Sequence, residues 1–365
     1  MSMDLSVFKN PELTKETLKR LEDLAEGKLY TFMEVCGTHT VSIARYGFRS
    51  LLPKNITLLS GPGCPVCVSA NKDLDMAIAL SKEEDIILTT FGDMMRVPGS
   101  STSLAKEKAK GADVRVCYSP LDAIQIAKDN PEKEVVFAGV GFETTAPIVA
   151  SAAIEAHEEG LENFSVLSVH KTMPNALEAI VNDKELGLDG LILPGHVSVI
   201  TGIKPYYFLA DTYHIPGVVT GFEPLDILLG IYELVDMVKH DRPAIKNAYT
   251  RGVRDEGNIA AQNIISEVFD EVDVEWRGLG MIPKSGLDFS NTYAYLDARK
   301  RFSDVKPEPT KEHKGCKCGE ILRGHMHPSE CPLFDRACTP QNPIGPCMVS
   351  SEGSCSAAYR YRDIG

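Results

Sequence analysis

The sequence predicts an α/β fold with two similar parallel-sheet lobes and a third, cysteine-rich iron–sulfur domain. Short apolar runs alternate with helical stretches up to about residue 241, a pattern typical of parallel βαβ units. Motif-bearing loops follow strands in the first half, and similar loops follow strands in the second half. Cysteines are absent from residues 118–315 and crowd into residues 316–355, so we expect a separate thiol site near the C-terminal end.

The composition favours a folded protein that binds another protein or a small ligand. The chain has 365 residues with 43% hydrophobic and 24% charged residues, which argues against disorder. The formal net charge of −13 and the lack of a Lys/Arg cluster argue against nucleic-acid binding. Neither a membrane-spanning apolar run nor a secretory signal is recognisable, so we expect a cytoplasmic protein. In that reducing compartment, ten cysteines indicate a metal or redox role.

The expected elements divide the chain into four parts. Residues 1–28 carry leucines at helical spacing and predict an amphipathic helix that packs on the C-terminal domain. Residues 29–134 and 135–241 predict two Rossmann-like lobes, with the last helix of the second as a candidate for return to the first. Residues 242–365 predict the C-terminal domain, whose Cys-, Pro- and Gly-rich end needs a metal or covalent bonds for stability. The predicted strands cover residues 29–35, 56–59, 85–90, 114–117, 135–140, 165–169, 190–193 and 217–219.

The C-terminal cysteines favour an iron–sulfur cluster. They lack the spacing of a zinc knuckle, and the surrounding glycines and prolines keep the backbone irregular, with amides free to point at sulfur. Four thiolates suffice for a [4Fe–4S] cluster, which leaves two for a redox-active disulfide beside it. A structural zinc site, ordinary disulfides and free thiols remain as alternatives. The cysteines concerned are Cys316, Cys318, Cys331, Cys338, Cys347 and Cys355.

A second thiol site is predicted at Cys64 and Cys67, in the segment GPGCPVC between a strand and a helix. A cysteine near a helix N-terminus has a lowered pKa, because the helix dipole and free amides stabilise the thiolate. The motif is typical of dithiol redox pairs and soft-metal ligands; the alternative is two structural thiols. Cys36, in EVCGTHT, ends the preceding strand, and parallel strands would bring it to the same sheet edge. His39 is a candidate ligand or hydrogen-bonding residue there.

Glu143 and His196 lie in loops that follow strands of the second half, in GFETTAP and PGHVS. Each loop offers backbone amides and a titratable side chain to a cleft expected between the lobes. The alternative is ordinary helix capping by Thr and Ser. Cys117 is expected to be a buried small apolar residue. Neither a P-loop nor a GxGxxG motif is present, which argues against nucleotide hydrolysis or a bound dinucleotide through those motifs.

Together these segments resemble the HypD family of [NiFe]-hydrogenase maturation factors. The resemblance runs essentially from end to end of the chain. It rests on EVCGTHT at 34–40, GPGCPVC at 61–67, GFETTAP at 141–147, PGHVSVITG at 194–202, CGEILRG at 318–324 and IGPCMVSSEGSC at 344–355.

The resemblance implies a metallocofactor assembly scaffold with redox activity rather than a conventional turnover enzyme. Such a protein would be a monomer when alone. It would work in a tight complex with HypC, and transiently with HypE as cyanide donor, to assemble an Fe(CN)₂CO unit. Cys36 would hold the iron, and Cys64 and Cys67 would be a thiol redox pair. From placement alone, His39, Glu143 and His196 are candidates to orient the iron, hydrogen-bond its ligands or move protons.

The resemblance also implies a division of labour among the C-terminal cysteines, by similarity to ferredoxin–thioredoxin reductase. The [4Fe–4S] ligands would be Cys316, Cys331, Cys338 and Cys355, with Cys318 and Cys347 as an adjacent disulfide. Two other functions fit part of the pattern. An iron–sulfur thiol–disulfide reductase acting on a protein would use the thiol pairs but leave Cys36 without a role. A pure interaction protein with a structural metal would need no redox chemistry at all.

Overall fold

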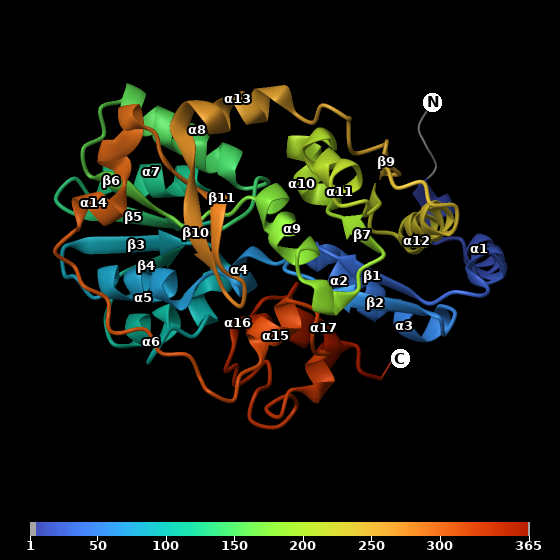
Figure 1. Ribbon diagram of the computed structural model, residues 1–365. Helices are drawn as coiled ribbons and strands as arrows, with labels where there is room; N and C mark the ends of the chain where they lie inside the picture. The colour runs from blue at the N-terminus through green and yellow to red at the C-terminus, as the bar shows by residue number, and fades with distance from the viewer. Residues whose placement is uncertain (1–4, 364–365) are drawn as a thin grey trace.

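The computed structural model describes residues 5–363 and places two parallel sheets side by side (Figure 1). The first sheet has the strand order β2-β1-β7-β8-β9. The second has the order β4-β3-β5-β6 and is also parallel throughout. The α/β prediction is therefore confirmed. The strands are β1 (Tyr30–Glu34), β2 (Ile56–Ser60), β3 (Ile86–Thr90), β4 (Val114–Val116), β5 (Glu134–Gly139), β6 (Phe164–Ser168), β7 (Gly190–Leu193), β8 (Gly217–Val219) and β9 (Ile245–Asn247).

Helices cover both faces of the sheets. All residues of the central strand β3 and of the edge strand β6 are buried, as the near-continuous apolar runs of parallel strands require. Within residues 5–363, no helix is both long and apolar enough to cross a lipid bilayer. The helices up to the end of the second half are α1 (Pro11–Ala25), α2 (Gly37–Arg45), α3 (Phe48–Leu51), α4 (Pro65–Val68), α5 (Asn71–Leu80), α6 (Leu104–Ala109), α7 (Pro120–Asp129), α8 (Ala146–Glu158), α9 (Met173–Val181), α10 (Gly195–Thr201), α11 (Tyr207–Asp211) and α12 (Pro224–Lys239).

The strands do not divide between the sheets at residue 134, as the predicted continuous lobes would require. β1 and β2 lie in one sheet with β7, β8 and β9, and the second sheet is nested in the chain between β2 and β7. The expected boundary separates the first residue of β5 from the rest of that strand. The alternation of strands and helices indicates parallel pairing, but an apolar strand carries no mark of which strand will be its neighbour.

The N-terminal helix α1 packs against α12, and not against the C-terminal domain as predicted. Leu21 and Ala25 of α1 are fully buried in one core with Ile231 and Val235 of α12. The helical leucine spacing predicts an apolar face correctly, but any apolar surface can cover such a face. In turn, α12 covers β7 and β8 of the first sheet. The helix that closes the second half of the chain thus returns to the first sheet.

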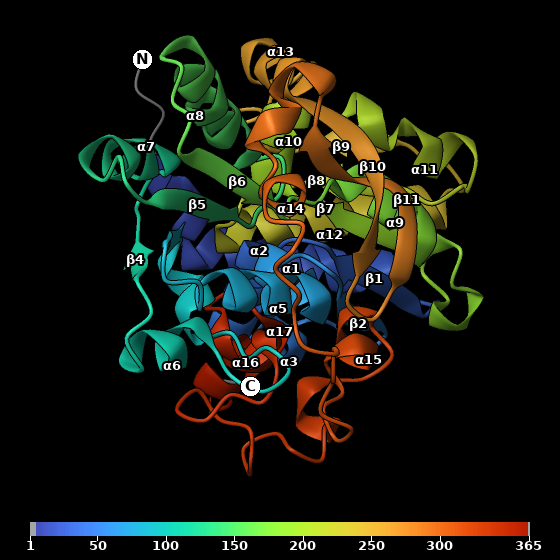
Figure 2. The ribbon, with the colours of Figure 1, turned by 90° about the vertical axis from the view of Figure 1, so that its left-hand side faces the viewer.

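Residues 242–301, predicted to belong to the C-terminal domain, instead complete the two lobes. β9 is the edge strand of the first sheet, α13 packs on α8, and α14 packs on β6. The cysteine-rich segment lies at the bottom of the molecule in both views, with α15, α16 and α17 toward the sheets (Figures 1 and 2). The remaining elements are α13 (Ile259–Val268), the antiparallel pair β10 (Phe269–Trp276) and β11 (Gly280–Phe289), α14 (Ala298–Arg301), α15 (Cys318–Leu322), α16 (Pro346–Val349) and α17 (Ser354–Arg360).

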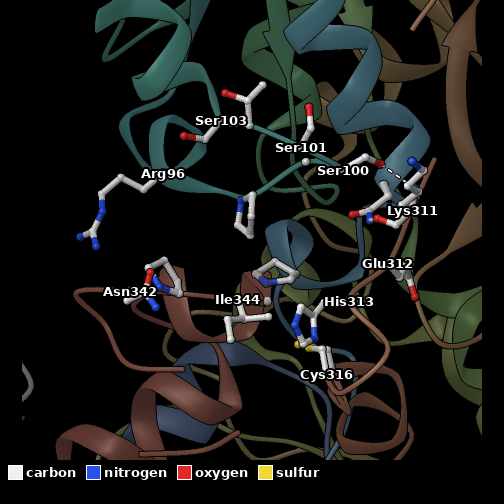
Figure 3. A pocket seen from close by; sticks show the side chains of 18 of the residues that line it. Arg96, Ser100, Ser101, Ser103, Lys311, Glu312, His313, Cys316, Asn342 and Ile344 are labelled. Carbon is white, nitrogen blue, oxygen red and sulfur yellow. Dashed lines mark hydrogen bonds between the residues drawn. The ribbon is translucent and has the colours of Figure 1, made fainter. Parts of the chain in front are cut away.

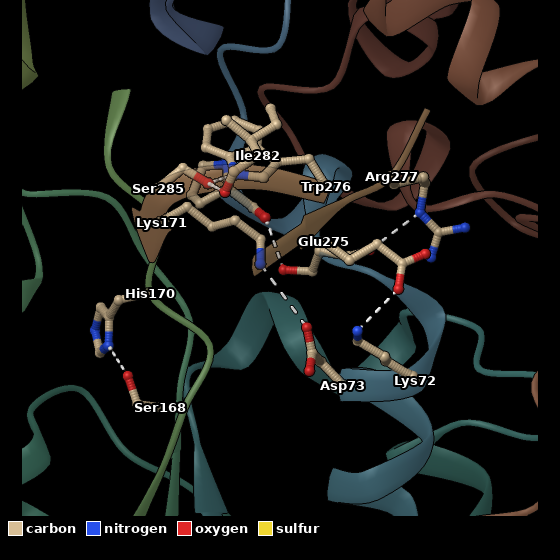
Figure 4. Close-up of polar contacts among 12 residues, drawn as sticks. Lys72, Asp73, Ser168, His170, Lys171, Glu275, Trp276, Arg277, Ile282 and Ser285 are labelled. Carbon is tan, nitrogen blue, oxygen red and sulfur yellow. Dashed lines mark hydrogen bonds and ion pairs between the residues drawn. The ribbon is translucent and has the colours of Figure 1, made fainter. Parts of the chain in front are cut away.

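A buried ion pair joins three segments that pack around the second sheet (Figure 4). Lys171, which follows β6, is 1% exposed, and its Nζ lies 3.8 Å from Oδ2 of Asp73 in α5. The other oxygen of Asp73 accepts a hydrogen bond from Arg299 of α14 at 2.7 Å. Burial lowers the pKa of Lys171, and the Asp73 carboxylate opposes that shift. Removal of Asp73 would therefore leave a buried ammonium group without its carboxylate.

The β10–β11 hairpin holds the segment that follows α4. The indole Nε1 of Trp276 donates to Oγ of Ser285 at 2.8 Å across the hairpin, and Trp276 is fully buried. Arg277 donates through Nε to the backbone oxygen of Ser69 at 3.1 Å. Because Ser69 directly follows α4, these contacts fix the helix that carries the cysteines of the GPGCPVC motif.

Candidate functional site

The carboxyl ends of the strands of both sheets border a cleft of about 510 Å³. Glu34 at the end of β1 lies beside Ser60 of β2 and Ile192 of β7, so the loops after these strands meet at one edge. Loops after β3, β4 and β5 form the opposite wall. The cleft is lined from the first sheet by Cys36, Gly63, Pro65, Val66, Pro194 and His196, from the second by Phe91, Asp93, Cys117, Tyr118, Phe142 and Thr144, and from the C-terminal segment by Glu352.

Cys36 occupies the N-cap position of α2, where β1 ends and the helix begins. The residue is 6% exposed, so its sulfur is almost completely removed from solvent. Burial raises the pKa of the Cys36 thiol to about 12, and the nearby Glu352 carboxylate adds to the rise. The free thiol is therefore protonated at neutral pH, and binding of a metal cation to the sulfur releases that proton.

Two motif glycines allow the surrounding loops to approach Cys36 closely. Gly37 donates its backbone N–H to the oxygen of Gly63 at 2.9 Å, which joins the two cysteine motifs. A Cβ on Gly63 would lie 2.4 Å from the backbone nitrogen of Cys36. A Cβ on Gly37 would lie 2.5 Å from Cβ of Glu352. Both distances are too short for a Cβ atom. These positions therefore require glycine because neighbouring segments pack against them, and not because of the backbone geometry of a turn.

Cys64 and Cys67 form a disulfide at the start of α4. Cys64 is the N-cap residue, and the backbone N–H of Cys67 donates to its sulfur at 3.2 Å. On one side of α4, Pro65 and Val66 line the cleft. Elsewhere α4 packs against α15 and α16, the helices that carry Cys318 and Cys347. The disulfide thus lies between the cleft and the C-terminal cysteines.

The C-terminal thiols converge on one small cavity with apolar walls. Cys347 lies beside it, next to Cys318. All six cysteines are free thiols, and all except Cys316 are buried. Converging buried thiols in an apolar shell suit soft iron, so this segment fits an iron–sulfur cluster. The cavity is lined by Cys316, Cys318, Cys331, Cys338, Cys355, Ile321, Leu333, Phe334 and Met348.

The two histidines predicted for the site have different surroundings. His196 lines the cleft, with Nδ1 3.4 Å from Oγ1 of Thr38, and Thr38 donates to Oε1 of Glu352 at 2.6 Å. His39 is fully buried behind the cleft wall, where Nε2 lies 2.9 Å from the backbone oxygen of Gly221. Burial lowers the pKa of His39 to about 4, so its ring is neutral at physiological pH. Both imidazoles contact the ring of Phe222 in a tilted arrangement, with ring centroids 4.8 Å apart for His39 and 4.1 Å apart for His196.

Glu143 is buried beneath the loop that lines the cleft. Its Oε1 accepts a hydrogen bond from the backbone N–H of Met173, the first residue of α9, at 2.8 Å. Its Oε2 has no hydrogen-bond partner among residues 5–363. Burial raises the pKa of Glu143 to about 7. The carboxyl group thus accepts from a free N–H group at the start of α9, and it also carries a proton below neutral pH. The alternative of capping by Thr and Ser is not seen at α8 or α10, whose N-cap residues make no side-chain cap hydrogen bond.

We expect the Glu143→Gln variant to change how stability depends on pH. Because the folded pKa of Glu143 is raised, the contribution of its bound proton is fully present below the unfolded pKa and is lost as pH rises through about 7. Glutamine stays neutral, so the variant should gain on the order of 1–3 kcal/mol relative to wild type between about pH 5 and about pH 8. Urea unfolding at both pH values measures this, and a pH-independent difference would contradict it.

Three residues at or beside the cleft have no functional role predicted from the sequence: Glu34, Cys117 and Glu352. Glu352 reaches the cleft from the turn between α16 and α17, and its one signal in the sequence is a carboxylate between the last two cysteines. Glu34 is fully buried, accepts a hydrogen bond from Thr40 at 2.6 Å and stands inside the EVCGTHT motif. Cys117 is buried as expected, but it also lines the wall of the cleft contributed by the second sheet.

Comparison with known proteins gives consistent matches over almost the whole chain. The family model named HypD, described as the hydrogenase formation hypA family, matches residues 12–362. The hydrogenase maturation factor HypD of Cupriavidus necator is 44% identical over 369 residues, which cover 98% of this chain and 97% of the relative. HypD of Escherichia coli is 41% identical over 362 residues, 97% of each chain. HypD2 of Bradyrhizobium diazoefficiens is 46% identical over 363 residues, 97% of this chain and 95% of the relative.

Proposed function

Because the chain belongs to the HypD family of hydrogenase maturation factors, we propose that it assembles the Fe(CN)₂CO unit together with HypC and HypE. In this proposal Cys36 holds the iron, and electrons reach the cleft through the thiol pairs from a [4Fe–4S] cluster. The observation that carries the proposal is the position of α4. Its disulfide lies between the cleft that contains Cys36 and the helices that carry Cys318 and Cys347. The free protein acts as a cytoplasmic monomer.

The surroundings of Cys36 suit an iron atom with soft ligands. A thiolate is a good ligand for low-spin iron that carries cyanide and CO. The cleft has room for a second cysteine supplied by HypC and for the diatomic ligands. The hydrogen-bonded series of His196, Thr38 and Glu352 lines the same space and can hold a proton or donate to a ligand. His39 and Glu143 do not line the cleft. His39 positions α2, and Glu143 positions α9.

The C-terminal cysteines provide the redox part of the proposal. We assign the cluster to Cys316, Cys331, Cys338 and Cys355, which all line the cavity. When bound, the cluster supplies electrons one at a time. The contact between Cys318 and Cys347 places a second thiol pair next to α4. Reduction of the Cys64–Cys67 disulfide takes up two electrons and two protons and leaves two thiols.

Infrared spectroscopy of the complex with HypC tests the proposal. The two proteins are purified together under anaerobic conditions from cells that contain the other maturation proteins. We expect cyanide and CO stretching bands from wild type, and loss of these bands in a Cys64→Ser/Cys67→Ser variant that keeps its cluster absorption. A cluster-replete wild-type complex without such bands would favour the thiol–disulfide reductase instead. A metal that is redox-silent, with no iron in the complex, would favour an interaction protein.

A further inference from the structure

A second pocket, of about 450 Å³, opens beside the cluster cysteines (Figure 3). We call it the Cys316 pocket. Its walls are the loop of residues 98–103, the segment 311–319 that carries Cys316 and Cys318, and the segment 341–346. In Figure 3, Arg96 and Lys311 lie on opposite sides of the opening and Cys316 lies at its base. The proposed iron site does not use this pocket.

The Cys316 pocket is a positively charged place on an acidic protein. The chain carries a net charge of −13, but Arg96, Lys106 and Lys311 all line this pocket and are exposed. None of these three has a carboxylate partner among residues 5–363. Glu312, which also lines the pocket, is paired with Arg277 at 2.9 Å. The unneutralised charge of the pocket is therefore positive.

The pocket also gives access to sulfur. Cys316 is the one C-terminal cysteine within residues 5–363 that is half-buried rather than buried. A Cβ on Gly345 would lie 2.7 Å from the sulfur of Cys316 and 2.9 Å from that of Cys318. Gly345 has an ordinary negative φ of −122°, so its backbone does not demand glycine. The glycine therefore lets the backbone pack directly against both sulfurs, and both cysteines line the pocket.

We propose that the Cys316 pocket is the docking site of an acidic one-electron donor protein. This inference rests on the proposed function, because it assigns the route by which the cluster is reduced. Carboxylates of the donor face Arg96, Lys106 and Lys311. The donor is oxidised by one electron at each encounter, and the thiolate-bound iron centre at Cys316 is reduced by one. Two encounters and two protons convert one disulfide of this chain into two thiols.

The arrangement of the cations favours a protein partner over a small anion. A small oxyanion is held by donors that converge on one point. Here Arg96 and Lys311 stand on opposite sides of the opening, and Arg96 donates to the backbone oxygen of Pro340. A surface with several carboxylates can meet separated cations at once. Such complementarity accelerates association at low salt and loses its effect when salt screens the charges.

Stopped-flow reduction of the cluster tests this docking site. The reductant is a reduced acidic [2Fe–2S] ferredoxin, and bleaching of the cluster absorption gives the second-order rate constant. We expect the Lys106→Glu/Lys311→Glu variant to be reduced at least about tenfold more slowly than wild type near 25 mM salt, with the difference falling below about twofold near 500 mM. Isothermal titration with the oxidised ferredoxin should show the same loss of binding.

The matched control carries the same change of charge elsewhere. Lys19 in α1 and Lys54 before β2 are exposed, and neither lines the Cys316 pocket. The Lys19→Glu/Lys54→Glu variant should keep the wild-type rate constant within about twofold. Photoreduced deazaflavin, a small uncharged reductant, should reduce the cluster at the same rate in wild type, the pocket variant and the control variant.

Equal rate constants for wild type and the pocket variant would overturn the docking site, as would an equal loss in the control. The infrared bands of the HypC complex, obtained with a chemical reductant, test the iron carrier separately. If the bands are present but the rate of reduction does not depend on the pocket charges, the docking site alone is refuted. If the bands are absent, the proposed function is refuted.

Discussion

Replacement of Cys36 by alanine is expected to abolish the cyanide and CO bands of the co-purified complex. Cys36 is the cysteine at the N-cap of α2, and its sulfur is the soft donor at this wall of the cleft. Alanine removes that sulfur while keeping the backbone contacts of Gly37 and Gly63. Loss of one buried sulfur costs on the order of 1 kcal/mol of unfolding free energy, so the variant stays folded. Infrared spectra and iron content of the complex measure the effect.

Cys117 provides the matched control for this experiment. It lines the same cleft from the second sheet, and burial raises the pKa of its thiol to about 11. The Cys117→Ala variant removes an equally buried thiol, and we expect it to keep all bands. Bands that persist in Cys36→Ala, or that vanish in Cys117→Ala alone, would show that the iron is held elsewhere.

Replacement of Gly63 by alanine is expected to damage the site through the backbone. The new Cβ would lie within 2.4 to 2.6 Å of the backbone nitrogen, Cα and carbonyl carbon of Cys36. No rotamer relieves a contact between Cβ and backbone, so the start of α2 or the GPGCPVC loop must move. We expect a loss of about 1–3 kcal/mol in the free energy of unfolding. Displacement of Cys36 should lower iron affinity by about 10- to 100-fold, the range found for residues that orient ligands.

Gly92 is the control for this substitution. It lines the same cleft, but the nearest atom to an added Cβ is Cγ1 of Val116 at 3.7 Å, which is ordinary contact. The Gly92→Ala variant should keep both its iron and its stability. Urea unfolding and iron analysis of the two variants, side by side, separate the effect of position from the effect of the added methyl group. Equal losses in both variants would show that the close contact between Gly63 and Cys36 is not the cause.

The sequence patterns allow the elements to be predicted, but not how they assemble. β9, a three-residue edge strand without a buried residue, is not predicted. The apolar runs locate the other eight strands of the two sheets closely, because a buried parallel strand needs apolar residues on both faces. They do not show that β1 pairs with β7, since strand pairing depends on the whole set of available neighbours. The same applies to α1, whose apolar face is covered by α12. The extended segment around Trp276 is predictable, but its contact with Ser69 is not.

The candidate site, too, is predictable from the sequence only in part. The cysteine motifs end strands, so the meeting of Cys36 with the Cys64–Cys67 loop follows from parallel pairing. Glu143 also stands in a loop after a strand, but its carboxyl group does not reach the cleft. It accepts a hydrogen bond from the N–H of Met173 at the start of α9, where backbone N–H groups have no partner within the helix. Glu352 escapes prediction because it reaches the cleft only through the docking of the C-terminal segment on α2.

The nesting of the second sheet has a consequence for how the chain is made. Ser60 ends β2 and Gly190 begins β7, so about 130 residues are synthesised between them. At about 5–20 residues per second, this takes on the order of ten seconds. During that time β1 is an open edge strand, which is a hazard for aggregation in a nascent chain. The lining of the cleft is complete only after Glu352 emerges, so a chain truncated before this residue lacks one wall of the cleft.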